Sequence, residues 1–510
     1  MGKVENILLL KRRVMDFLEE LKSRQEITLH QLEEELDELL GMDERVPAVL
    51  INLLPRTRDP VILDLIAYAL EFAGDESIVG PLIELLVSRE TSPEAKLRII
   101  SVLNAYGYDS FSPEVIGSDP KVAAELEELA DRSFRETMEM AERDEESLSL
   151  ILEEIERFPF EAKIDYIRYL ADYASPGAVR VLQALGMVVG DDRIAEAAIE
   201  SLSGIKLPAA LTALRDLARR APSEELRSLA DRGARRLALM GIEENEQEEM
   251  RLGRVYKAIL TSIDGNGDRI IWVCRFNRAD PERLFFSSFM VNTDKGIREC
   301  FGTTKLHLTN FHAAYDKLKL SLSTVEVDYE YVVKLIKDAL YQNLSSGCPA
   351  PYPFSVWRMI FADVDLTPQR YEIDLGRFGD LLSSGEEMLS QAPQLLKLNE
   401  FSDWYDHSHK AIEYYLMISK LRSRREAAKV IRRYVREVFE PKRKSLKRRL
   451  ELMAEFMAMR GEERMARLAL VAAMKLADET FPIHRHPLIA GMIGASLRLA
   501  RAYLKRRGEG

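Results

Sequence analysis

The sequence predicts a mostly α-helical protein: an α-solenoid in the first half, then a small α+β domain, then a C-terminal helical region. Three observations lead to this prediction. Windows in the first half repeat with a fixed period, the hydrophobic pattern changes to a period of two from Val255, and helical periodicity returns from about Leu375. A chain of 510 residues is also too long for one hydrophobic core. We predict an N-terminal helical segment, a solenoid, an α+β domain and a helical bundle at residues 1–41, 42–250, 251–370 and 371–510.

The composition favours a folded, cytoplasmic protein. Hydrophobic residues make up 46% and charged residues 31%, and no apolar run approaches the ~18–20 residues that span a membrane. The apolar patch Ile7–Leu10 is followed by three basic residues, which predicts the start of an amphipathic helix rather than a signal peptide. Cys274, Cys300 and Cys348 lie far apart without a CxxC pair, so we expect neither a disulfide framework nor a cysteine zinc site.

Internal repeats define the first half. A window that starts at Met42 aligns with the next window, which starts at Gly74, after a shift of 32 residues. A second pair of windows, which starts at Ala174 and Lys206, shows the same shift. Each window contains two stretches with apolar residues at i, i+3, i+4 and i+7, separated by a turn with Pro, Gly or Asp. One helical pair cannot bury its apolar faces alone, whereas stacked pairs can.

These helix–turn–helix units resemble the HEAT-like repeats of α-solenoid proteins. The resemblance covers about Met42–Gly241 and rests on the spacing of apolar residues, so it implies a fold and not an activity. Because such stacks present long surfaces that bind proteins, the resemblance also implies a protein partner for the solenoid. The match is interrupted at Tyr106–Ala130, where we expect a loop before a charged helix. The acidic segment Glu243–Met250 is predicted to end the solenoid.

The middle of the chain is rich in β-branched and aromatic residues. Alternation along the second predicted strand gives two largely apolar faces, so each face of the sheet needs a cover. The helix that follows Asp328 and stops at Gly347 is one candidate cover. The three predicted strands are Val255–Ile263, Arg269–Phe276 and Leu284–Val291, with a Gly-rich hairpin turn between the first two.

The turn DGNGD has some features of a calcium loop. Asp264, Asn266 and Asp268 fill the first three ligand positions of an EF-hand loop, but two arginines stand where that loop needs Gly and Glu. The flanking segments are also predicted strands rather than helices. We therefore interpret the segment as a hairpin turn whose glycines permit positive φ.

A metal-dependent nucleic-acid-processing enzyme is the alternative hypothesis. An Asp at the end of a first strand, followed by a Gly-rich turn and antiparallel strands, resembles the ribonuclease-H-like nucleases, and Asp264 would then bind Mg²⁺. Such chemistry needs several converging acids, and the candidates are Glu330, Asp338, Asp363 and Asp365. Apart from Asp264 in this alternative, the sequence predicts no catalytic residue, no cofactor and no metal site.

The histidine pairs do not suit a metal site. His407 and His409 would point to different sides of a helix. His486 directly precedes Pro487, which is the expected first residue of a helix, so we interpret His486 as a residue at the helix start.

Helical periodicity in the last third predicts a bundle or a further solenoid segment. Gly461, Pro441 and Pro482 are expected to end helices. The predicted helices are Leu375–Leu398, Phe401–Leu421, Arg424–Phe439, Arg443–Arg460, Glu463–Asp478 and Pro487–Arg506.

A basic block lies within this helical region. Between Lys420 and Arg449 the chain has 14 Lys/Arg and 3 Asp/Glu, a local balance of +11 within a net charge of −12, which leaves −23 for the rest. Four of these cations are spaced by four, three and four residues, so we expect them to share one helical face. They are Arg425, Lys429, Arg432 and Arg436. The predicted partner-binding residues are Arg425, Lys429, Arg432, Arg436, Lys442, Arg443, Lys444 and Lys447.

Three interpretations of the basic block stay open. It contacts the phosphates of RNA or DNA, it contacts an acidic surface of the solenoid or of another protein, or it is a solvated helix face. The nearby Trp404, Tyr405, Tyr414 and Tyr415 could stack on bases, although aromatics at helical spacing are more often core residues. We expect a binding or scaffold protein without catalysis of its own and without a membrane partner.

Overall fold

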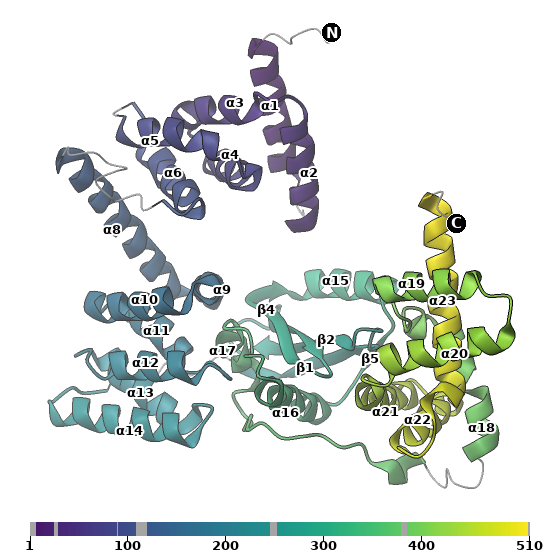
Figure 1. Ribbon diagram of the computed structural model, residues 1–510. Coiled ribbons are helices and arrows are strands. Elements are labelled where there is room, and N and C mark those ends of the chain that lie inside the picture. The colour runs from purple at the N-terminus through teal and green to yellow at the C-terminus, as the bar shows by residue number, and fades with distance from the viewer. Residues whose placement is uncertain are drawn as a thin grey trace. The chain divides into compact units, whose positions relative to one another are not determined.

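The computed structural model describes residues 7–24, 29–88, 90–108, 120–244, 252–378 and 385–507 (Figure 1). Helices predominate, and one antiparallel sheet lies between two helical regions of the chain, which confirms the predicted fold class. The chain divides into two compact units, Met1–Thr137 and Met138–Gly510, and each is described by itself. The predicted boundary at residues 250 and 251 lies outside the described residues. Within the described ranges, no helix combines the length and the apolarity that crossing a membrane requires.

Helical pairs build the first unit around a continuous hydrophobic core, in which Leu18, Leu50 and Ile66 are fully buried. The two windows that repeat from Met42 and Gly74 each contain a pair of helices, as predicted. The helices and short 3-10 turns of this unit are α1 (Ile7–Ser23), α2 (Leu29–Gly41), α3 (Val46–Leu53), η1 (Leu54–Arg56), α4 (Pro60–Ala73), η2 (Glu76–Ile78), α5 (Val79–Val87) and α6 (Pro93–Ala105).

The second unit begins with a stack of antiparallel helices. Each helix contacts the next but one, so that α9, α11 and α13 form one layer and α10, α12 and α14 the other (Figure 1). The windows from Ala174 and Lys206 again contain one helical pair each, an arrangement compatible with a helical-repeat solenoid. The expected loop within Tyr106–Ala130 lies outside the described residues for positions 109–119. Helix α8 (Pro120–Arg143) begins in the first unit and ends in the second, because the boundary between Thr137 and Met138 falls within it. The helices of the stack are α9 (Glu145–Arg157), α10 (Phe160–Tyr173), α11 (Pro176–Leu185), α12 (Asp192–Leu202), α13 (Pro208–Arg220) and α14 (Glu224–Leu239).

A five-stranded antiparallel sheet follows, with strand order β4-β3-β2-β1-β5. The three predicted strands correspond to β1, β2 and β3, whereas β4, β5 and the helix between them were not predicted. The elements are β1 (Leu252–Thr261), β2 (Asp268–Asn277), β3 (Arg283–Asn292), β4 (Gly296–His307), α15 (Leu308–Ser321), β5 (Thr324–Glu326), α16 (Tyr329–Ser346), α17 (Phe354–Trp357) and η3 (Arg358–Phe361).

Each face of the sheet is covered, as its apolar alternation requires. On one face, Cys274 and Phe286 pack with Phe311 of α15. On the other face, Phe289 lies 5.6 Å from the Phe361 ring of η3, and Phe361 in turn stacks on Tyr329 at the start of α16. Figure 1 shows α15 on one side of the sheet and α16 and α17 on the other, so the predicted cover by α16 is confirmed.

The helical stack docks on β4 and α17 through buried polar contacts. Trp357 is 2% exposed, and its indole nitrogen donates a hydrogen bond to Ser149 of α9 at 2.8 Å. The carboxylate of Glu146, also on α9, accepts hydrogen bonds from the Thr303 hydroxyl at 2.7 Å and the Thr304 amide at 2.8 Å on β4. These contacts tie the helical layer to the edge strand of the sheet.

The C-terminal region is helical but more broken than predicted. In the described parts of the segment expected as one helix from Leu375 to Leu398, the structure has two 3-10 turns and one short α-helix, because Gly376 and Pro393 disfavour a helix interior. The helix expected from Phe401 to Leu421 begins only at His409. The elements are η4 (Leu375–Phe378), α18 (Gly385–Gln391), η5 (Ala392–Lys397), η6 (Asn399–Phe401), α19 (His409–Ser419), α20 (Arg424–Tyr434), the π-helical turn η7 (Val435–Phe439), α21 (Arg443–Met459), α22 (Glu463–Ala477), η8 (Ile483–Arg485) and α23 (Pro487–Arg507).

Helix α21 docks on the end of the sheet where its hairpins turn. Arg449 is 7% exposed and donates to the carbonyl oxygen of Gly265 at 2.6 Å and to the carboxylate of Asp294 at 2.8 Å. It thereby joins the β1–β2 turn to the β3–β4 turn. A Cβ at Gly267, where φ is +96°, would lie 2.6 Å from the Nε atom of Arg449, so the turn needs glycine there for two reasons.

A buried arginine lies beside this contact. Arg269 of β2 is 4% exposed, and none of its three guanidinium nitrogens makes a hydrogen bond to a described residue. Burial lowers the pKa of Arg269, an effect that the nearby Tyr331 and Glu455 oppose. Two tyrosine hydroxyls, those of Tyr331 and Tyr371, donate to the Glu455 carboxylate at 2.8 and 2.7 Å. The interface between the sheet and α21 therefore contains several buried polar groups.

Candidate functional sites: a cationic helix face and an arginine-lined cavity

Helix α20 and the π-helical turn η7 that follows it carry the cations that the sequence places on one face. Ser423 begins the helix by accepting a hydrogen bond from the amide of Glu426 at 3.4 Å. On the inner side, Tyr434 is buried, donates a hydrogen bond to Asp406 at 2.8 Å and lies against Tyr414 with ring centroids 4.8 Å apart. This packing turns the opposite side of the helix toward solvent.

Four cations follow one another along that exposed side. Arg425, Lys429, Arg432 and Arg436 are all exposed, and none of them forms an ion pair with a residue in the described part of the chain. At a helical rise of about 1.5 Å per residue, Arg425, Lys429 and Arg432 are spaced by roughly 6 and 4.5 Å along the axis of α20, and Arg436 follows in the π-helical turn η7. We call these four residues the cation row.

The remaining predicted partner-binding residues divide into two kinds. Lys442 and Lys444 are exposed. Arg443 is buried, and its guanidinium donates to the carbonyl oxygens of Leu476 at 2.8 Å and Phe481 at 3.0 Å, just beyond the end of α22. Lys447 pairs with Glu451 at 2.6 Å. Arg443 and Lys447 thus already have internal partners.

The aromatic residues near the basic block belong mostly to the core. Trp404 is buried and donates its indole hydrogen to the carbonyl oxygen of Ile263 at 3.1 Å. Tyr414 is buried against Tyr434. Tyr405 and Tyr415 are partly exposed. Only these last two could reach a base, so stacking adds little to the cation row.

The Asp264 carboxylate holds the hairpin turn together. Its Oδ1 atom accepts hydrogen bonds from the amides of Asn266 at 2.9 Å and Asp268 at 2.8 Å. The amide of Gly265 donates to the Asp403 carboxylate at 2.9 Å, which ties the turn to the C-terminal region. The geometry is that of a side chain that organises a turn.

Substitution of Asp264 by asparagine is expected to change the free energy of unfolding by less than about 1 kcal/mol, because an amide oxygen can still accept both hydrogen bonds. Asp264→Ala should cost about 1–2 kcal/mol, because both amides then lose their acceptor. Chemical denaturation followed by circular dichroism measures both. The enzyme alternative requires instead that Asp264→Asn abolishes a Mg²⁺-dependent cleavage of nucleic acid by the wild type, and such a result would favour it.

Three of the four other acids of that alternative are held by separate partners, and the fourth, Glu330, is exposed. Asp338 accepts from Arg448 at 2.9 Å, and Asp363 pairs with Arg275 at 2.7 Å. Asp365 accepts a hydrogen bond from the amide of Thr367 at 3.1 Å. In the described ranges, no group of three or more His, Cys, Asp and Glu side chains is arranged to hold a metal ion.

The histidines have structural surroundings. His407 is exposed before α19, and His409 is the first residue of that helix. His486 is fully buried, with its Nε2 atom 3.1 Å from the carbonyl oxygen of Ala472. Burial lowers the pKa of His486 to about 4, so the ring is neutral at neutral pH. This agrees with a structural role at the start of α23.

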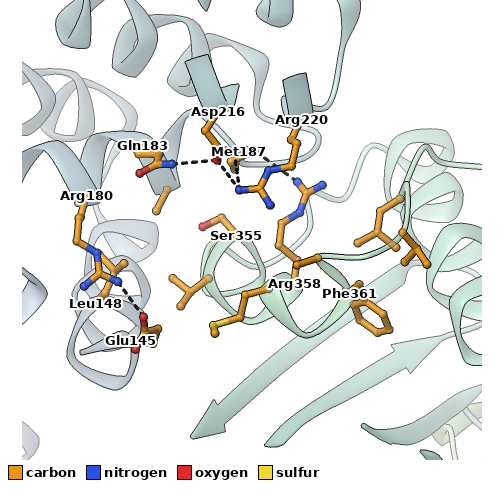
Figure 2. Close-up of a pocket in the computed structure, with 16 residues that line it drawn as sticks. Glu145, Leu148, Arg180, Gln183, Met187, Asp216, Arg220, Ser355, Arg358 and Phe361 are labelled. Atoms are coloured by element: carbon orange, nitrogen blue, oxygen red, sulfur yellow. Dashed lines mark hydrogen bonds and ion pairs between the residues drawn. The ribbon is translucent and has the colours of Figure 1, made fainter. Parts of the chain in front are cut away.

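A second candidate site is a cavity of about 240 Å³ in the second unit, which the sequence analysis did not anticipate. One wall comes from α9, α11 and α13 of the helical stack, and the other from the segment 355–366, which includes η3 (Figure 2). Figure 2 shows the Arg220 and Arg358 side chains reaching toward each other from the two walls. The apolar lining includes Leu148, Met187 and Phe361.

The polar groups on the stack side of the cavity bind one another. Arg180 donates to the carbonyl oxygens of Ala141 at 2.9 Å and Glu142 at 2.7 Å, and pairs with the Glu145 carboxylate at 3.1 Å. These contacts hold Arg180 at one end of the cavity.

Asp216, at the other end, accepts from Arg220 at 2.6 Å and from Gln183 at 3.0 Å. It also lies 3.9 Å from Arg219. Both carboxylates that line the cavity, those of Glu145 and Asp216, therefore have cationic partners already.

Arg358 lacks such a partner. Among the described residues it forms no ion pair, and its Nη1 atom lies 3.7 Å from the sulfur of Met187, which is a weak acceptor. Burial and, to a lesser extent, the nearby Arg220 cation lower the pKa of Arg358 to about 10. Arg358 is still charged at neutral pH, so the cavity contains one cation that has no ion-pair partner among the described residues.

The sequence did not predict this cavity because the residues that line it lie far apart in the chain. Arg220 ends α13, and Arg358 follows α17, in segments that carry no motif. One feature of the sequence could have indicated the cavity. Arg358 follows Trp357 in a short apolar segment, and an arginine among buried residues needs an anionic neighbour.

Comparison with known proteins adds little. No protein-family model matches the chain, and no curated protein matches it. A solved structure of human deoxyhypusine hydroxylase in complex with glycerol is similar over 46% of this chain and 98% of that chain, at 16% identity and a TM-score of 0.17. A TM-score that low carries no argument, so the sites are interpreted from their own geometry.

Proposed function

We propose that the protein binds an anionic macromolecule through the cation row, and that nucleic acid is this partner. The observation that carries the proposal is the exposure of Arg425, Lys429, Arg432 and Arg436 on one helix face without a carboxylate partner among the described residues. Charges that follow one another along one exposed side suit a ligand whose negative charges repeat along a line, as phosphates do. Lys442 and Lys444 extend the positive surface.

The intramolecular interpretation of the basic block has less support. No cation of the row pairs with a carboxylate of α9–α14 in the part of the chain that the structure describes. Most of the acidic segment Glu243–Met250 lies outside the described residues. An acidic surface of another protein remains the competing partner, and the experiment below separates it from nucleic acid.

We further propose that the helical pairs are HEAT-like repeats that act as a scaffold for a protein partner. The shift of 32 residues between windows and the two layers of α9–α14 support this. The separated cysteines suit the reducing environment of the cytoplasm, where we place this activity. The metal-dependent alternative centred on Asp264 has weaker support, because that carboxylate organises a turn.

The test is fluorescence anisotropy of labelled single- and double-stranded RNA and DNA at about 50 and 200 mM salt. We expect binding at low salt that weakens as salt rises. The variant Arg425→Gln/Lys429→Gln/Arg432→Gln/Arg436→Gln should bind at least about 10-fold more weakly, and its slope of log K against log salt should be shallower by up to about 3.6 for duplex DNA.

A matched control removes the same charge elsewhere. Arg157, Arg168, Arg232 and Arg235 are exposed on α9, α10 and α14, and their simultaneous change to Gln should leave most of the affinity. No binding by the wild type at low salt, or equal loss in both variants, would contradict the proposal and direct the search to an acidic protein.

A further inference from the structure

The arginine-lined cavity has a neighbour that shares its wall. A second cavity of about 290 Å³ lies on the other side of Arg220, Arg358, Ala362, Val364 and Leu366, all of which line both spaces. Arg220 and Arg358 therefore stand at the junction of two hollows rather than at one closed end. A ligand at this junction could place its charged group between the two arginines and extend into either space.

The charges around the junction are uneven. In the first cavity three arginines, Arg180, Arg220 and Arg358, face the two carboxylates of Glu145 and Asp216. Because Arg180 and Arg220 each use one carboxylate, the excess cation is Arg358.

The second cavity does not supply the missing anion. Its acids, Asp363 and Asp365, are near Arg275 at 2.7 Å and Lys337 at 3.8 Å. Arg227 also lines that cavity and adds a further positive charge. The surroundings of Arg358 thus keep their positive excess on both sides.

The Arg220 and Arg358 cations lie close together, which is unfavourable unless an anion binds between them. The Arg220 charge disfavours the ionised form of Arg358, and burial does the same. An oxyanion between the two guanidinium groups would offset both the repulsion between the two cations and the cost of burying Arg358. Each planar guanidinium can donate two parallel hydrogen bonds to a carboxylate or phosphate. The apolar wall formed by Leu148, Met359 and Phe361 would contact a non-polar body.

We propose that this cavity is a binding site for a small organic anion, whose carboxylate or phosphate group lies between Arg220 and Arg358 and whose apolar body lies against Leu148 and Phe361. The ligand contacts both the helical stack and the segment 355–366, so it ties these two parts of the second unit together. The site is independent of the cation row, because it uses different residues and a different size of ligand.

The probes are hexanoate, hexyl phosphate and hexanol, measured by isothermal titration calorimetry against the full chain at constant ionic strength. We expect saturable binding of at least one of the two anions and no binding of hexanol at the same concentration. Binding of hexanoate alone assigns a carboxylate ligand, and binding of hexyl phosphate alone assigns a phosphate monoester. Binding of both assigns an oxyanion of either kind, and binding of neither, or equal binding of hexanol, overturns the proposal.

Substitutions inside the cavity and in the cation row test where the small anion binds. Arg358→Gln should weaken binding of the anion about 10-fold or more, whereas Arg358→Lys, which keeps the charge without the planar fork, should have a smaller effect. The matched control is the Gln variant of the cation row, which should bind the small anion as the wild type does. Unchanged affinity in Arg358→Gln, or loss in the cation-row variant instead, overturns the assignment.

A measurement on the wild type covers the case in which Arg358→Gln does not fold. Hydrogen–deuterium exchange should be slowed by the bound anion in residues 355–366 and at the C-terminal end of α13, and hexanol should leave it unchanged. Protection confined to α20 or α21 would place the anion on the exposed cations and reject the cavity.

Discussion

Replacement of Trp357 by alanine is expected to lower the free energy of unfolding of the second unit by about 4 kcal/mol. Trp357 is 2% exposed at the junction between the helical stack and the sheet, and it donates the hydrogen bond to Ser149. The sheet is shaped to accept its ring: a Cβ at Gly302 of β4 would lie 2.4 Å from a ring carbon. Alanine would leave a large cavity and an unpaired hydroxyl at this junction.

Two smaller changes separate packing from the hydrogen bond. Trp357→Phe keeps most of the ring contact and should cost less than Trp357→Ala, while Ser149→Ala removes only the acceptor and should cost about 1 kcal/mol. Urea denaturation followed by circular dichroism gives the free energies, and hydrogen exchange should show faster opening of α9 and β4 in Trp357→Ala. A loss below about 1.5 kcal/mol in Trp357→Ala would mean that the stack does not depend on this contact.

Replacement of Arg449 by methionine should cost about 3 kcal/mol. Methionine keeps the apolar stem but removes the bonds to Gly265 and Asp294, which leaves the Gly265 carbonyl oxygen without its donor. Because these bonds join both hairpin turns to α21, we also expect faster hydrogen exchange at the β1–β2 and β3–β4 turns.

The matched control for Arg449→Met is Arg433→Met. Arg433 is 67% exposed and pairs with Glu437 one helical turn away at 2.9 Å. Loss of such an exposed pair should lower the free energy of unfolding far less than loss of the buried Arg449 contacts. Equal costs for the two variants would show that Arg449 contributes no more than a surface cation, contrary to its position in the structure.

The hydrophobic periodicity of the sequence predicted the helices and strands whose buried residues recur at regular intervals. The windows from Met42, Gly74, Ala174 and Lys206 each contain a helical pair, because the apolar residues that repeat along a helix are the ones it buries. The strands β1, β2 and β3 were likewise visible, since a strand covered on both faces is apolar over much of its length.

Strand β4 escaped prediction for a physical reason. It is an edge strand, and its sequence, GIRECFGTTKLH, mixes charged and polar residues without clear alternation. Thr303 and Thr304 are there because the Glu146 carboxylate of α9 binds them, and Gly302 because Trp357 covers it. Each of these residues is explained by a partner far away in the chain.

In the basic block, too, one property could be predicted from the sequence and another depended on the tertiary structure. The spacing of Arg425, Lys429 and Arg432 was enough to predict one shared face, because that face belongs to the single helix α20, and Arg436 follows in the π-helical turn η7. The spacing could not distinguish these residues from Arg443 and Arg449, which are cations of the same block with buried partners. Whether a cation is exposed depends on what packs against its helix.

The sequence by itself therefore determined the helical repeats, the central strands and the face that the cation row occupies, because each follows from the period of a single element. The tertiary structure alone decided which charges are neutralised. It paired Arg449 with Asp294, and it brought Arg220 and Arg358 together at a cavity. Charge pairing acts over a few ångströms in space, and no regular spacing in the sequence records it.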